Sequence, residues 1–122
     1  MRRTLILVGG VLNTLFFAFH LLLGWRLWRL GPTSGLRPLL ETFNLGSPLM
    51  VGFLALVSLA FPAELLTTRV GRSVLWLAVL LYLSRAIAEE ALFVRPQPMI
   101  AGACLLVAAV YAAAGLMRGK AA

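Results

Sequence analysis

Residues 4–28 read TLILVGGVLNTLFFAFHLLLGWRLW, and this stretch decides the fold class. Its only charged residue, Arg26, lies near its end. A helix needs about 20 predominantly apolar residues to cross the hydrocarbon core of a bilayer. Three later stretches meet the same criterion. The sequence therefore predicts four membrane spans, at about residues 4–28, 41–65, 73–94 and 98–117.

The breaks between these spans are short and well marked. Gly-Pro-Thr-Ser-Gly occupies residues 31–35, a polar segment occupies 67–72, and Pro-Gln-Pro at 96–98 cannot continue a helix. Only helices and closed barrels satisfy their backbone groups in lipid, and no alternation with a period of two is present. Short connections make neighbouring helices antiparallel. We therefore predict an all-α, up-down-up-down four-helix bundle that forms a single transmembrane domain over residues 1–122.

Composition supports a membrane environment. Apolar residues make up 61% of the chain and charged residues 12%, against roughly 25% charged residues in ordinary soluble domains. A soluble domain of 122 residues could not bury this much apolar surface. The N-terminal segment imitates a signal peptide, but its apolar run is too long and no Ala-x-Ala site follows, so we expect it to be retained as the first span.

The net charge of +7 is spread in ones and twos between the apolar runs. This distribution is typical of helix-end anchors and argues against a nucleic-acid partner. One predicted side carries Arg2, Arg3, Arg69, Arg72, Arg118 and Lys120, and the other carries Arg26, Arg29, Arg37 and Arg95. Because basic residues favour the cytoplasmic side, we predict a multi-pass protein of the bacterial inner membrane with both termini in the cytoplasm.

Polar side chains within the predicted spans point to a candidate site, because such residues are costly in lipid. In the antiparallel topology most of them fall in the non-cytoplasmic half, with one near the midplane below the others. The candidate ligand-binding residues are Asn13, His20, Glu41, Asn44, Arg85 and Glu89. They predict either a polar pocket open to the outer face or a structural clamp, in which Arg85 pairs with Glu89 one turn away and with Glu41 across the bundle.

The single histidine leaves several roles open, as a metal or haem ligand, a proton acceptor or a packing residue. A haem bundle usually needs two axial histidines, and no close metal-ligand spacing is present. Catalytic signatures such as Gly-x-Ser-x-Gly are also missing. With one cysteine, Cys104, no intramolecular disulfide can form. We therefore predict no metal, no cofactor and no catalytic residue, which favours a non-enzymatic role.

The leading hypothesis is a protein that binds a small, unidentified ligand or supports a membrane complex. The alternatives are a proton-coupled transporter that titrates His20 and Glu89, and a membrane redox or enzyme subunit that uses His20. The expected partners are the lipid bilayer and either a second copy of the chain or another membrane protein. The many small residues of the last predicted span suit either internal packing or such a homodimer.

Three segments carry a resemblance to a known group of proteins: GGVLNTLFFAFHLLLGW (9–25), PLLETFNLG (38–46) and ELLTTRVGRSVLWLAVLLYLSRAIAEEALF (64–93). Together they resemble small bacterial four-helix membrane proteins without an established function. The chain is similar to proteins of the DoxX type in size and layout. The resemblance implies the fold but no activity, and it covers most of the chain. The characteristic positions are Asn13, His20, Asn44, Glu64 and Arg85.

Overall fold

The computed structural model describes residues 1–29, 37–92 and 96–117, apart from the side chains of residues 37–41 and 43. Within these residues every regular element is a helix, as the sequence predicts. The elements are α1 (Arg2–Arg29), α2 (Arg37–Ala60), α3 (Pro62–Thr67), α4 (Arg69–Leu92) and α5 (Pro98–Leu116). Among them α1, α4 and α5 are each long and apolar enough to cross a membrane. The apolar part of α2, Asn44–Ala60, is shorter.

The predicted second span, 41–65, is two helices. The break lies at Phe61, because Pro62 has no N–H to continue the α2 ladder and instead begins α3 as its first residue. The polar segment 67–72, predicted as a break, contains only one non-helical residue, Thr68. Its backbone is extended, its N–H donates to the Glu64 carbonyl, and its hydroxyl accepts the Gly71 N–H at 2.9 Å. Thr68 thus closes α3 and caps α4.

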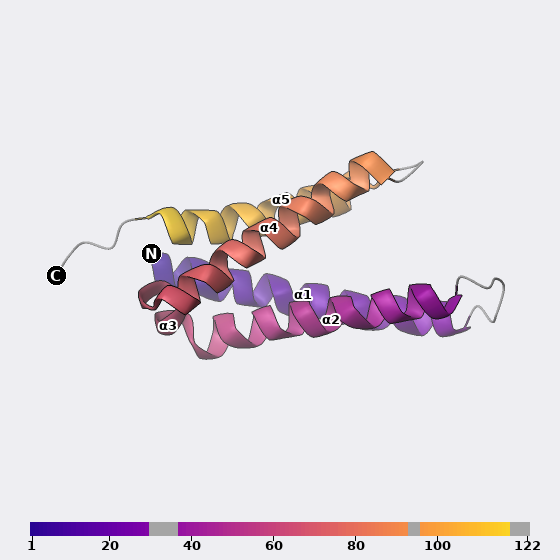
Figure 1. Cartoon of the computed structure of the whole chain (residues 1–122), viewed down its shortest axis with the longest axis horizontal. Helices are drawn as coiled ribbons and strands as arrows, with labels where there is room; N and C mark the ends of the chain where they lie inside the picture. Colours follow the sequence, from indigo (N-terminus) through magenta and orange to yellow (C-terminus); the bar gives the residue numbers. More distant parts are fainter. Residues whose placement is uncertain (30–36, 93–95, 118–122) are drawn as a thin grey trace.

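The helices form two antiparallel hairpins. One consists of α1 and α2, the other of α4 and α5, and α1 packs against α5 to join them. The short α3 closes one end, where the N-terminus and the end of α5 also lie (Figure 1). There the Arg2 Nε donates to the Ala114 carbonyl at 3.1 Å. The two hairpins diverge toward the opposite end (Figure 1). The molecule is therefore packed at the α3 end and opens away from it.

A buried polar network lies at the centre of the packed region. The Asn13 Nδ2 donates to the Gly9 carbonyl and to the Tyr111 hydroxyl, both at 2.8 Å, and the Tyr82 hydroxyl donates to Asn13 Oδ1 at 2.6 Å. Ser58 Oγ and the Tyr111 hydroxyl share a hydrogen bond of 2.7 Å. Each of the long helices α1, α2, α4 and α5 therefore contributes one side chain, and apolar residues such as Ile6, Leu54, Leu75 and Val107 surround them.

Close helix packing at this network depends on a glycine. A Cβ placed on Gly9 would lie 2.8 Å from the Tyr111 ring, so any larger residue would push α1 away from α5. Gly102 on α5 is the matched contrast, because nothing lies within 4 Å of the position that its Cβ would occupy. Small residues at such contacts allow helices in lipid to approach closely.

We therefore expect Gly9→Ala to lower the free energy of unfolding by about 1–3 kcal/mol, since overpacking moves Tyr111 off its partners. Gly102→Ala should leave stability unchanged or raise it by up to about 1 kcal/mol, since alanine is the better helix former. Reversible unfolding in mixed detergent micelles with increasing dodecyl sulfate, followed by circular dichroism, measures both. Equal stability of the two variants would contradict the packing described.

Candidate functional site

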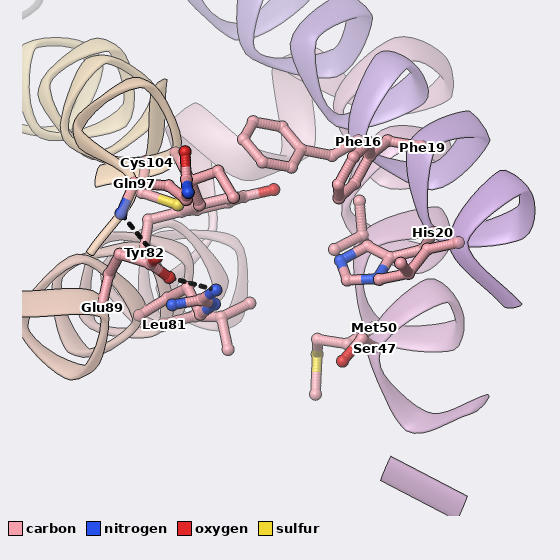
Figure 2. A pocket seen from close by; sticks show the side chains of 14 residues that line it. Phe16, Phe19, His20, Ser47, Met50, Leu81, Tyr82, Glu89, Gln97 and Cys104 are labelled. Atoms are coloured by element: carbon pink, nitrogen blue, oxygen red, sulfur yellow. Dashed lines mark hydrogen bonds and ion pairs between the residues drawn. The ribbon is translucent and has the colours of Figure 1, made fainter. Parts of the chain in front are cut away.

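A cavity of ≈ 470 Å³ lies between the two hairpins, on the side of the network away from α3. All four long helices line it. One wall is formed by α4 and α5 and holds Glu89 and Gln97, whereas the facing wall, from α1 and α2, holds His20 and Ser47 (Figure 2). Arg85, the ion-pair partner of Glu89, also lines the cavity. The cavity forms here because the two hairpins diverge. Nearer to α3, the hairpins are held together by the contact between α1 and α5 and by the polar network.

Glu89 is the most buried charged group of this wall, with 1% of its surface exposed. The Arg85 Nη2 lies 2.6 Å from its Oε2, and the Gln97 backbone N–H donates to its Oε1 at 2.9 Å. Gln97 precedes the first residue of α5, where the backbone N–H groups have no partner within the helix. The Glu89 carboxylate therefore links the last turn of α4 to the start of α5, and Arg85 offsets its charge.

His20 reaches the cavity from α1. Its Nδ1 is buried and has no hydrogen-bond partner among the described residues. His20 and Asn44 together line a second pocket of ≈ 270 Å³ between α1 and α2, and the Asn44 side chain lies within hydrogen-bonding reach of the imidazole. The Asn44 Nδ2 also lies 2.7 Å from the place that a Cβ on Gly24 would take. The imidazole thus lines both spaces, and its Nδ1 has no hydrogen-bond partner among the described residues.

The described contacts place the candidate residues in separate groups. His20, Arg85 and Glu89 line the large cavity, and His20 lies across it from Glu89 (Figure 2). Asn44 lines only the second pocket. Asn13 belongs to the core network, two helical turns before His20, and lines neither pocket. The side chain of Glu41 lies outside the described residues, so its predicted pairing with Arg85 stays a prediction.

Several residues of the site and of the adjacent core network were not predicted. Gln97 was assigned only to a helix break, although its backbone N–H holds Glu89. Ser47 and Cys104 line the cavity within apolar stretches. Tyr111 and Ser58, which complete the core network, also lie in such stretches. One feature of the sequence pointed to the network: each long helix carries an isolated polar residue within an otherwise apolar stretch.

The described lining of the cavity is mainly apolar, with few ionisable groups. Of the residues that the structure describes, no group of three His, Cys, Asp or Glu side chains is close enough to hold a metal ion. The only cysteine, Cys104, is buried in the cavity wall. The carboxylate of Glu89 is already bound by Arg85 and Gln97. Most of the remaining lining is aliphatic or aromatic.

Comparison with known proteins does not assign the site. No family model, no curated protein and no solved structure matches the chain.

Two adjacent glutamates allow a test of the carboxylate at the cavity wall. Glu89→Gln should destabilise the protein, because the amide keeps an acceptor for Gln97 but removes the charge that Arg85 requires. Glu90→Gln is the matched control, since Glu90 is exposed and a surface substitution usually changes stability little. The same detergent titration gives both midpoints. A midpoint for Glu89→Gln equal to that of Glu90→Gln would show that the pair with Arg85 contributes nothing.

Proposed function

We propose that this protein is a non-enzymatic, integral four-helix bundle of the bacterial inner membrane that binds a small ligand in the cavity between its hairpins. In this proposal all four long helices cross the bilayer, both termini lie in the cytoplasm, and the cavity occupies the non-cytoplasmic half.

The lengths and surfaces of the helices support this arrangement. At 1.5 Å per residue the 24 residues of α2 extend about 36 Å, which exceeds the hydrocarbon thickness of about 30 Å. Large apolar side chains are exposed on each long helix, including Leu15, Leu56, Leu80 and Leu106, as expected for surfaces that face lipid. Trp25 and Trp28 are exposed near the end of α1, where aromatic rings suit the membrane interface.

One observation carries the proposed ligand binding: a ≈ 470 Å³ cavity is lined by the buried Glu89 carboxylate with its partly exposed partner Arg85, and by His20 from another helix. The volume falls within the range of about 300–1,000 Å³ typical of small-molecule sites. The Arg85–Glu89 ion pair itself lies within one helix, α4, and His20 takes no part in the core network, so the packing around that network requires neither.

Two neighbouring leucines of α1 provide a matched test. Leu23 lines the cavity, whereas Leu22 is exposed on the outer surface of the helix. Leu23→Trp should fill the cavity and expel its occupant, and Leu22→Trp should place the same indole in lipid. Small molecules bound to each purified protein, extracted in polymer nanodiscs, are identified by mass spectrometry.

The expected result is a molecule retained in stoichiometric amount by the wild-type protein and by Leu22→Trp but lost from Leu23→Trp. The proposal fails if the wild-type protein holds no such molecule, or if both tryptophan variants hold it equally. Circular dichroism of the two variants checks that both retain their helices.

A further inference from the structure

The charge balance of the cavity restricts its occupant. One guanidinium and one carboxylate line it, from Arg85 and Glu89, and they lie 2.6 Å apart. With His20 neutral, the described lining has no net charge. A charged group brought into this low-dielectric space would either remain uncompensated or displace a partner of the pair, and both are costly. The lining therefore favours a polar but uncharged group.

His20 indicates that the polar group of the ligand must form a hydrogen bond. Its Nδ1 is buried without a hydrogen-bond partner in the described part of the chain, and a buried polar atom in that state lowers stability unless a ligand or water satisfies it. Neutral imidazole can donate or accept through this atom, according to its tautomer. A hydroxyl, carbonyl or amide group of a ligand would satisfy it from the cavity side.

The rest of the lining suits an apolar body. Phe16, Phe19 and Leu23 come from α1, and Met50 and Val51 come from α2. Aromatic rings and a flexible methionine adapt readily to alkyl or ring-shaped groups. A molecule that fills this space is therefore amphiphilic, with its polar group near His20 and its larger, apolar part against these side chains.

The arrangement of the helices indicates how such a molecule arrives. Within the described residues, α2 and α4 hardly pack against each other, although both line the cavity. Their separation grows toward the cavity end of the molecule (Figure 1). Met50 and Ser47 on α2 stand opposite Leu81 on α4 with open space between them (Figure 2). In a membrane this side of the cavity would face lipid.

Building on the proposed function, we propose that the cavity takes an uncharged amphiphile dissolved in the bilayer, which reaches it laterally between α2 and α4 and hydrogen-bonds to His20.

The charge preference is tested with three photoactivatable probes in phosphatidylcholine vesicles that contain the full-length protein. The probes are hexadecanol and the corresponding alkyl sulfonate and alkyltrimethylammonium, each with a diazirine at the same chain carbon. Labelling of cavity peptides should be at least several-fold stronger with the alcohol than with either ion. Equal or stronger labelling by a charged probe would overturn the proposed ligand class.

The role of His20 is tested with the same alcohol. His20→Phe should reduce labelling of the cavity peptides several-fold, because it keeps a ring but removes the polar atoms. His20→Asn should restore much of the labelling, since its amide places a polar atom near the position of Nδ1. Equal labelling of the wild-type protein and both variants would exclude the hydrogen bond to His20.

The lateral route is tested with a thiol at a more accessible cavity position, Leu81→Cys combined with Cys104→Ala, because Leu81 lines the cavity and is only partly buried whereas Cys104 is 1% exposed. In vesicles, membrane-dissolved N-pyrenylmaleimide should modify this thiol, and a trimethylammonium methanethiosulfonate added to the water should not. Met50→Trp should slow the modification several-fold, whereas Leu49→Trp on the exposed face of α2 should not. Modification by the aqueous reagent, or by neither reagent, would overturn lateral access.

These outcomes separate the two proposals. If the bound molecule depends on Leu23 but proves to be charged or to arrive from water, the binding site stands and the ligand class or the route is wrong. If the Leu23 and Leu22 variants retain the same molecule, the proposed function itself fails.

Discussion

The fold depends on one satisfied polar network in an otherwise apolar core. Asn13 uses its carbonyl oxygen for Tyr82 and its amide for both Gly9 and Tyr111, and Tyr111 extends the network to Ser58. Burying these groups without partners would be costly in a low dielectric, so the helices are stable together only in the register that pairs them. In lipid this matters more than in water, because apolar contact alone gives little preference between registers.

The network also determines where the cavity lies. Tyr82 takes part in both, because its hydroxyl donates to Asn13 while the residue lines the cavity wall. Its ring meets Phe16 of the other hairpin at a centroid distance of 5.5 Å. Toward α3, buried residues such as Ile6, Leu75 and Val107 fill the space between the hairpins. Beyond Tyr82 the hairpins diverge with no comparable filling in the described residues, so a cavity remains.

The sequence predicts the long helices well, because one criterion identifies them: a run of about 20 predominantly apolar residues. The prediction extended the second helix too far, since the apolar character continues through Phe61 and Pro62 and only the missing proline N–H ends the helix. The core network was not predicted, because its partners are 53 to 98 residues apart and a tyrosine in an apolar stretch carries no sign of its partner. Asn13 and His20 share a helix face, but seven residues separate them by about 10 Å along the axis.

The residues of the site differ in whether the fold requires them. Glu89 was predicted to pair with Arg85 from their spacing, and that pair is present. Its bond to the Gln97 N–H depends on how the chain turns between α4 and α5, which spacing cannot reveal. This bond gives Glu89 a structural task, and Arg85 then serves to offset its charge. His20 takes no part in the core network, and its Nδ1 has no hydrogen-bond partner among the described residues. Structural need thus accounts for the carboxylate, whereas the proposed ligand would satisfy the unpartnered nitrogen of the imidazole.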